Sequence, residues 1–235
     1  MKKLIIVALM VTCCSTVMAQ DNGKEKKTTW YVKVGGAFCT LADLESEEDV
    51  DLSTGSKTGY LIGIAFDRQI GTKGWFWGAG LQLRSKGGKA DTYSYQDMND
   101  YDSGGGASWT DTYNGEYTYN INALEIPLSV GYKLNITDDW AVDLRVGGFI
   151  DYDLWGNVKQ KSYGWYDGKS YDNGETECDL DDLDGYESLG YGALAGIGVW
   201  YKNFNLNFTY EFGFAESFET GGKERNMLLT LGYSF

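Results

Sequence analysis

Apolar and polar residues alternate with a period of two along most of this 235-residue chain. Alternation of this kind is typical of β-strands that have one apolar and one polar face. Eight runs show it, and they begin near Trp30, Tyr60, Trp75, Tyr117, Trp140, Ser188, Phe204 and Asn226. In each run one face is bulky and apolar, while the other is small or charged. The pattern predicts an all-β fold of eight strands.

The fourth run changes its phase part of the way along. Tyr117 and Ile121 are apolar at odd positions, whereas the apolar residues from Leu124 onward stand at even positions. An extra residue in a strand shifts the phase in this way, so we predict a β-bulge near Asn122-Ala123.

The segments between the runs alternate in length. Long ones span about 40–57, 86–116 and 155–186, a medium one spans about 215–223, and short ones lie near 70–74, 135–139 and Lys202-Asn203. Transmembrane barrels have short periplasmic turns and long extracellular loops. We therefore predict an eight-stranded antiparallel up-and-down transmembrane β-barrel with both termini on the periplasmic side.

Side-chain volume predicts which face of the barrel meets lipid. An eight-stranded lumen is only wide enough to be filled by side chains, and the bulky aromatic face would overfill it. A soluble lipocalin-like carrier, whose apolar face points inward, is the alternative. The small and charged face suits a narrow lumen in which buried charges must pair. The predicted lumen charges are Lys33, Asp67, Arg84, Glu125, Lys133, Asp143, Arg145, Asp151 and Glu211.

Aromatic residues cluster at both ends of the predicted strands. Membrane barrels are enriched in aromatic residues at these two levels, where the strands cross the membrane interfaces. Those toward the long loops are Phe38, Tyr60, Tyr119, Tyr152, Tyr191 and Phe212. The predicted interface residues beside the short turns and termini include Trp30, Trp75, Trp77, Trp140, Tyr201, Phe204 and Tyr233.

The N-terminus has the features of a secretory signal peptide. Lys2 and Lys3 precede an apolar run, and small residues lead to Ala19. We predict a signal peptide over 1–19, a short periplasmic segment over 20–28 and one barrel domain over 29–235 in the outer membrane. Loss of the two lysines leaves 18 basic residues against 34 acidic ones, which makes nucleic acid an unfavourable partner.

Cys39 and Cys178 are the two cysteines of the predicted mature chain. Exported proteins form disulfides, and both residues fall near the extracellular end, so a disulfide between them is one alternative and two free thiols the other. Cys13 would be acylated in a lipoprotein, but Thr12 stands where a small residue is needed and the signal continues to Ala19.

One strand carries a family signature. Leu124-Glu125-Ile126-Pro127-Leu128, followed by Val130-Gly131-Tyr132-Lys133, resembles the LEIPL motif of PorT-like outer-membrane β-barrels. The likeness continues through Gly147-Gly148, the glycine-alternating run Gly190 to Gly198 and the final seven residues. In similar proteins the last strand resembles the signal that the barrel-assembly machinery reads, which implies this role for Leu231, Tyr233 and Phe235. One family member takes part in a secretion and gliding apparatus, a role that the resemblance does not carry to this chain.

The chain contains no histidine. Barrel enzymes resemble one another in relying on a histidine as general base, and this chain lacks that group. We expect no enzyme and no cofactor.

Two acidic clusters lie over 43–51 and 175–184. The second does not match an EF-hand loop, because Leu183 and Asp184 stand at positions that require a ligand and a glycine, so we expect solvated surface, or contact with divalent ions shared with lipid headgroups, rather than a metal site.

The long loops are rich in Tyr, Trp, Gly, Asp and Ser, as over 93–95, 109–113 and 162–166. This composition resembles the contact loops of binding proteins, although such loops also simply cover a barrel mouth. We predict a structural or surface-interaction barrel that lies in the outer-membrane bilayer, with a filled lumen and a possible surface ligand. The alternatives are a secretion or transport accessory, a narrow pore, and the lipocalin-like carrier.

Overall fold

The computed structural model describes residues 28–44, 50–99, 108–166, 169–183, 185–218 and 221–235. The predicted signal peptide and most of the segment over 20–28 lie outside these residues. Within them, none of the helices is both long and apolar enough to cross a membrane. The elements are β1 (Thr28–Leu44), β2 (Val50–Gly55), β3 (Lys57–Ile70), β4 (Trp75–Asn99), β5 (Ser108–Asn135), β6 (Trp140–Tyr166), β7 (Lys169–Asp179), a 3₁₀ turn η1 (Leu180–Asp182), β8 (Leu189–Tyr201), β9 (Phe204–Phe218) and β10 (Gly221–Ser234).

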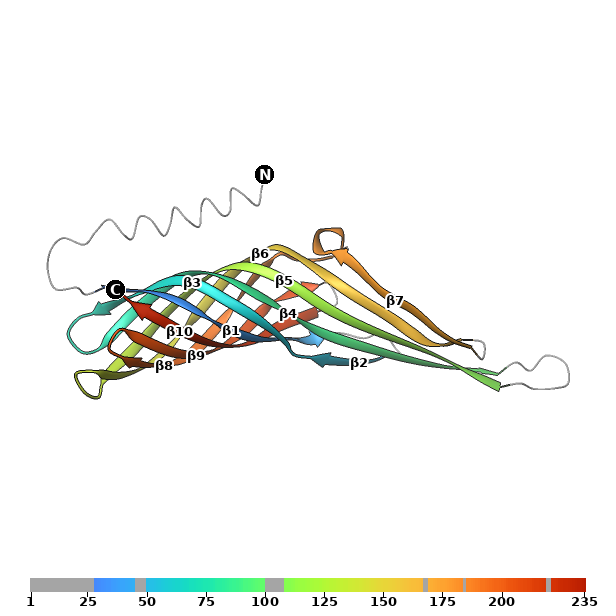
Figure 1. Cartoon of the computed structure of the whole chain (residues 1–235), viewed down its shortest axis with the longest axis horizontal. Helices are drawn as coiled ribbons and strands as arrows, with labels where there is room; N and C mark the ends of the chain where they lie inside the picture. Colours follow the sequence, from blue (N-terminus) through green and yellow to red (C-terminus); the bar gives the residue numbers. More distant parts are fainter. Residues whose placement is uncertain (1–27, 45–49, 100–107, 167–168, 184, 219–220) are drawn as a thin grey trace.

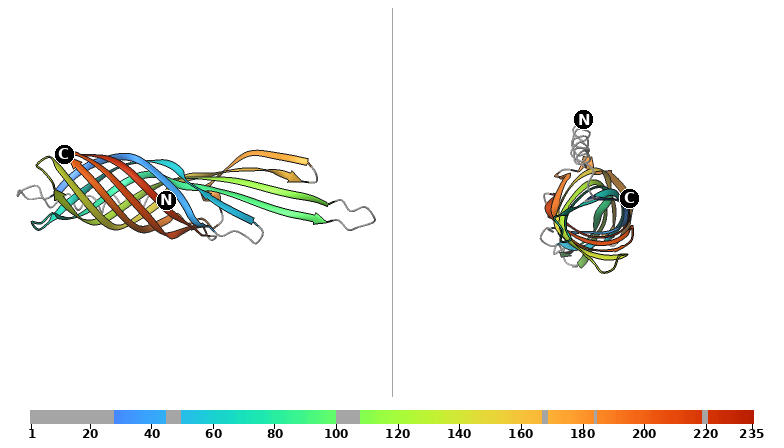
Figure 2. Two further views of the ribbon diagram at one scale, coloured as in Figure 1. Left: turned by 90° about the horizontal axis from the view of Figure 1, so that it is seen from below. Right: turned by 90° about the vertical axis from the view of Figure 1, so that its left-hand side faces the viewer.

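Eight of the strands close into a ring. The antiparallel pairings run from β1 through β3, β4, β5, β6, β8 and β9 to β10, and β10 pairs with β1 again. Figure 2 shows this ring from the side and end-on. Among the described strands, β2 pairs only with β4 and β7 only with β6. The predicted antiparallel up-and-down barrel is confirmed, with two additional short strands outside the ring.

The outer surface of the barrel is apolar. Leu144 and Val146 on β6 are 61% and 58% exposed, and Val34 on β1 is 57% exposed. Because successive strand residues point to opposite faces, Asp143 and Arg145 of the same strand are buried inside. Exposed apolar side chains around the wall require lipid, and the arrangement contradicts the lipocalin-like alternative.

Two of the predicted long loops are in fact strands. β4 and β5 continue as a paired hairpin to Asn99 and Ser108, and β6 and β7 pair beyond the barrel as well. We call this five-stranded extension the arm: β2, β7, and residues 87–99, 108–121 and 156–166 of β4, β5 and β6. It projects well past the barrel rim (Figures 1 and 2). Neighbouring strands supply the backbone hydrogen bonds here, so a loop-like composition does not prevent pairing.

The predicted bulge lies at the expected level but on the neighbouring strand. Asn122 pairs with Trp155 and Ala123 pairs with Asp153, which leaves Leu154 of β6 as the extra residue. On β5 itself, Ile121 and Ala123 both face inward and are fully buried. The apolar pattern of β5 changes phase because its outer face leaves lipid for water at this level.

Candidate functional site: a lumen closed by ion pairs

The centre of the lumen is organised around Arg84 of β4, which is fully buried. Its guanidinium forms ion pairs with carboxylates on four other strands. It contacts Glu125 of β5, and lies 3.2 Å from Asp151 of β6, 3.0 Å from Glu211 of β9 and 3.3 Å from Glu224 of β10. One side chain therefore links five of the eight barrel strands across the lumen.

Lys86, two residues farther along the same face of β4, holds the extracellular end of this network. Its ammonium nitrogen lies 2.6 Å from Asp151, 2.8 Å from Asp153 and 2.6 Å from Glu224. The hydroxyl of Tyr186, in the segment between η1 and β8, donates a hydrogen bond to Asp153. The mouth of the barrel is thus closed by side chains rather than by an open channel.

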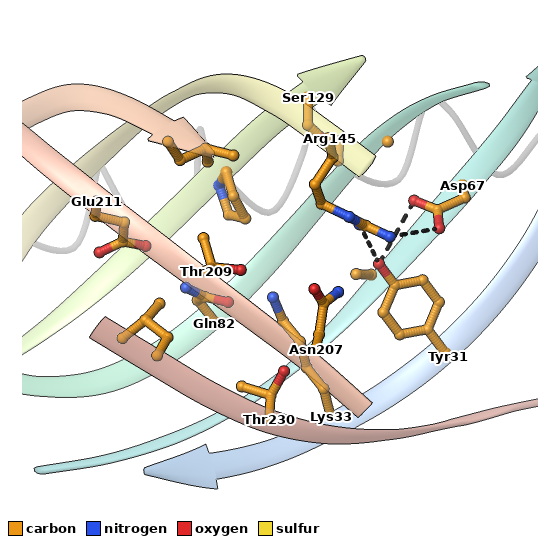
Figure 3. Close-up of a pocket in the computed structure, with 16 residues that line it drawn as sticks. Tyr31, Lys33, Asp67, Gln82, Ser129, Arg145, Asn207, Thr209, Glu211 and Thr230 are labelled. Carbon is orange, nitrogen blue, oxygen red and sulfur yellow. Dashed lines mark hydrogen bonds and ion pairs between the residues drawn. The ribbon is translucent and has the colours of Figure 1, made fainter. Parts of the chain in front are cut away.

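A second network closes the periplasmic half (Figure 3). Arg145 of β6 lies 2.9 Å from Asp143 and 3.4 Å from Asp67, and it donates a hydrogen bond of 3.2 Å to the hydroxyl of Tyr31. The indole of Trp200 donates to Asp143 and packs edge-on against Tyr31, with ring centroids 5.7 Å apart. Aromatic and charged side chains therefore fill this half together.

Between the two networks lies a cavity of about 40 Å³ lined by Lys33, Gln82, Asn207 and Glu211 among others. Figure 3 shows these four side chains on one side of the cavity and the Arg145 network on the other. The buried carbonyl oxygens of Gln82 and Asn207 have no hydrogen-bond partner among the described residues. A polar cavity of this size holds a few water molecules. It is far too small to serve as a passage for solutes.

The structure brings most of the predicted lumen charges into these two networks. Arg84, Glu125, Asp151 and Glu211 meet in the first, and Asp67, Asp143 and Arg145 meet in the second. Lys33 lines the cavity but makes no ion pair within 4 Å among the described residues, and Lys133 instead places its ammonium 3.6 Å from the ring centre of Trp200.

Sequence reasoning missed three charges of the network: Lys86, Asp153 and Glu224. All three lie just outside the residue ranges over which we predicted the inward-facing positions of their strands. The signal was present, because each residue continues the inward-facing alternation by one more step.

The predicted interface aromatics pack against one another around the periplasmic end. Ring centroids lie 5.3 Å apart for Trp75–Tyr132, 4.7 Å for Trp140–Tyr201 and 5.3 Å for Phe204–Tyr233. Phe66 lies between Trp30 and Trp77, 4.9 and 5.0 Å from their ring centres. The residues predicted for assembly, Leu231, Tyr233 and Phe235, stand on the lipid face of the last strand and are 51%, 46% and 68% exposed.

The possible disulfide is not formed, and both thiols are free. Cys39 is buried inside the barrel, where its Sγ lies 3.7 Å from the carbonyl oxygen of Ser85. Cys178 is exposed on β7, opposite Val158. The two residues do not pair because the arm carries β7 away from the barrel wall.

The acidic clusters lie only partly within the described residues. Asp43 pairs with Arg225 at 3.3 Å and Glu175 pairs with Lys159 at 2.8 Å. The hydrogen bond from Lys159 lowers the pKa of the Glu175 carboxyl. In the part of the chain that the structure describes, no group of three or more His, Cys, Asp or Glu residues is arranged to hold a metal ion.

Solved structures with a similar strand arrangement include Ail, the attachment invasion locus protein of Yersinia pestis, at 12% identity, with 89% of this chain and 99% of that chain covered and a TM-score of 0.32. The outer membrane protein OprG from Pseudomonas aeruginosa matches at 13% identity, with coverages of 89% and 97% and a TM-score of 0.35. Neisserial surface protein A matches at 14% identity, with coverages of 87% and 95% and a TM-score of 0.33.

No curated protein matches the chain. A family model described as "Outer membrane protein beta-barrel domain" matches residues 18–219. The match covers most of the barrel and the arm, and an outer-membrane barrel agrees with the apolar outer wall. The chain therefore belongs to the outer membrane protein beta-barrel domain family.

Proposed function

We propose that this protein is a sealed outer-membrane anchor that presents its arm to the exterior. The observation that carries the proposal is the Arg84 network, because its buried ion pairs cross the lumen from β4 to β10. A barrel filled in this way supplies no path for solutes, so its use lies in what it holds outside the membrane. Surface-exposed segments on a rigid scaffold are where binding residues concentrate.

Three further features belong to this proposal. The signal peptide over 1–19 directs export, the segment over 20–28 stays in the periplasm, and 29–235 forms the barrel domain. The barrel-assembly machinery reads the last strand through Leu231, Tyr233 and Phe235, whose side chains alternate on one face of β10. The protein catalyses no reaction, since the chain offers no histidine as a general base.

A planar bilayer experiment tests the sealed lumen. Purified full-length protein, inserted into the bilayer, is expected to show no steady conductance steps, because two ion-pair networks occupy the lumen in series. Insertion is verified in the same sample by the mobility difference between boiled and unboiled protein on a gel. Steady steps from inserted protein would contradict the proposal and favour a narrow pore.

An accessory role in secretion is the second candidate. It is supported by the LEIPL-like strand, Leu124 to Leu128, in which Glu125 is an Arg84 partner. The resemblance concerns PorT-like barrels, whose motif this strand shares. Affinity purification of the tagged protein from solubilised membranes distinguishes the two candidates: a stoichiometric set of secretion components supports the accessory role, and recovery of the barrel alone supports the anchor.

A further inference from the structure

The two faces of the arm differ sharply in charge. In antiparallel pairs, residues directly opposite each other point to the same face. The pairings therefore assign one face, which we call the inner face, to Leu52, Thr54, Ala90, Thr92, Ser94, Tyr113, Gly115, Tyr117, Tyr119, Val158, Gln160, Ser162, Gly164, Tyr171, Thr176 and Cys178. None of these residues is charged; the same pairings also place Asp111, opposite Gln96, and Lys169, opposite Tyr166, on this side of the sheet, at the hairpin ends of the arm. The opposite face carries Lys89, Asp91, Glu116, Lys159, Lys161, Glu175 and Glu177.

This separation is not required for folding. Both faces of the arm lie outside the membrane-spanning wall, as the projecting strands in Figures 1 and 2 show. A charged face on each side would keep the sheet soluble, and 23% of the chain is charged. An uncharged stretch rich in tyrosine and hydroxyl groups, between the barrel rim and the hairpin ends, is instead the composition of a contact surface, because tyrosine supplies large area with little conformational freedom to lose.

The tyrosine rings are held in place on this face. The hydroxyl of Tyr117 accepts a hydrogen bond of 3.2 Å from Gln160, and Tyr113 and Ser162 share one of 3.1 Å. A Cβ added at Gly115 would lie 2.9 Å from the ring of Tyr117, so the ring occupies the space beside the glycine. Burial raises the pKa of Tyr117 to about 12. The ring is therefore held in place by its contacts and stays uncharged.

The same face is hollowed at its barrel end. A cleft of about 270 Å³ is lined by Tyr117, Tyr119, Gln160, Thr176 and Leu183 among others. Glu177 is the only charged residue among the lining residues, and its carboxylate accepts a hydrogen bond from Asn157 on the opposite face. Aromatic walls with a few amide and hydroxyl groups are typical of sites for small uncharged ligands.

We propose that the inner face of the arm binds a neutral oligosaccharide, with sugar rings stacked on Tyr117 and Tyr119. The backbone groups of a sheet interior are already paired within the sheet, so recognition must use rings, hydroxyls and amides, which match the C–H faces and hydroxyls of a sugar. The run from Tyr113 to Tyr119 extends for about 20 Å, which accommodates a linear chain. Anionic sugars are disfavoured by the carboxylates of the opposite face and by the net charge of −14.

The inference rests on the proposed function and is tested by calorimetric titration of the full-length protein in detergent. The probes are three neutral hexasaccharides, cellohexaose, maltohexaose and mannohexaose, with hexagalacturonate and hexalysine as charged probes. We expect at least one neutral probe to bind and both charged probes to bind at least tenfold more weakly. Binding is expected to be independent of pH between about 5 and 7, because the ordinary pKa values of carboxyl, thiol, phenol and ammonium groups lie outside that range.

Two tyrosine variants locate the site. Tyr117→Ala is expected to raise the Kd about tenfold, equivalent to about 1.4 kcal/mol. Tyr163→Ala is the matched control, because Tyr163 lies on the opposite face of the same sheet, where its hydroxyl donates to Glu116 at 3.0 Å. Its Kd should stay within about twofold of the wild type. The gel mobility shift of each variant confirms that the barrel is folded.

Three outcomes overturn the inference: no neutral probe binds, a charged probe binds best, or Tyr163→Ala weakens binding as much as Tyr117→Ala. These outcomes do not contradict the proposed sealed anchor if the inserted protein shows no conductance in the planar bilayer. Conductance from inserted protein would instead remove the proposed function, whether or not the arm binds sugar.

Discussion

Arg84 shows how a single side chain can stabilise the whole barrel. Its four carboxylate partners come from strands as far apart as β5 and β10, and Asp151 and Glu224 lie 67 and 140 positions away in the chain. Removing one partner from a buried ion pair is costly because the remaining charges stay away from water. The free energy of unfolding should therefore depend on Arg84 far more than on any exposed charge.

Replacing Arg84 with Met tests this dependence. We expect the free energy of unfolding to fall by about 3–5 kcal/mol, since Glu125 and Glu211 would remain buried with no cation of the described residues within ion-pair distance. Urea unfolding in detergent micelles, followed by loss of the gel mobility shift, measures the change. The matched control is Lys159→Met, whose pair with Glu175 is exposed and contributes little to stability because solvent screens it. Equal losses in the two variants would contradict the central role of Arg84.

Tyr117 makes a separate prediction about pH. Burial raises its pKa from the ordinary value of 10.0 to about 12. Between these two values the folded arm retains the phenol proton while an unfolded arm releases it, so stability falls as the pH rises from about 10 to 12. The phenolate absorbance of the wild type minus that of Tyr117→Phe should give a transition near pH 12. A difference transition near pH 10 would show that the ring is solvated.

At the scale of elements, the strands change solvent along their length. After Asn122 in the chain, the even positions of β5 face lipid and are apolar, as Leu128 and Val130 illustrate with exposures of 52% and 50%. Before Asn122, the odd positions carry the apolar residues and pack with Val158 and Leu180. Each segment of β5 turns its apolar face away from water. The apolar positions therefore change from odd to even along β5, although the strand itself does not turn over.

Adjacent glycines in β1 test the packing of the barrel wall. A Cβ at Gly35 would collide with the carbonyl oxygen of Leu229, whereas the nearest atom to a Cβ at Gly36 is the Gly59 oxygen at 3.9 Å. Gly35→Ala should therefore lower the free energy of unfolding by about 1–3 kcal/mol. Gly36→Ala should be neutral, or stabilising by up to about 1 kcal/mol. The same urea titration compares them, and equal effects would be inconsistent with the register of β1 and β10.

At the scale of the whole molecule, ring closure separates three environments: lipid outside the wall, a sealed interior, and an arm in water. The two cysteines lie in two of these environments: Cys39 is 1% exposed inside the barrel, and Cys178 is exposed on the arm. Their reactivity therefore reports both the closure of the lumen and the side of the membrane on which the arm lies.

A maleimide that does not cross membranes should label intact cells at Cys178. Cys178→Ser should abolish this labelling, and Cys39 should react only after denaturation, because it is enclosed between β3, β4 and β10. Mass spectrometry of tryptic peptides identifies the labelled residue. Labelling of Cys39 in the folded protein would argue for an open lumen, and labelling of Cys178 only in broken cells would place the arm in the periplasm.

The sequence by itself determined the eight barrel strands and the face that meets lipid. Period-two alternation sets the inward and outward positions directly, and the volume of Trp75, Trp77 and Trp140 cannot fit within an eight-stranded lumen. The charged residues of the lumen followed from the same alternation, because they share its phase. These are local properties, readable along a single strand.

Only the tertiary structure decided which charges meet, where the strands end and whether the thiols pair. The partners of Arg84 come from strands that become neighbours across the lumen only when the ring closes. The arm strands lack the strong apolar alternation that lipid imposes, so their pairing depends on the strands beside them. The neutral inner face of the arm likewise combines residues of five strands, and no single segment of the chain displays it.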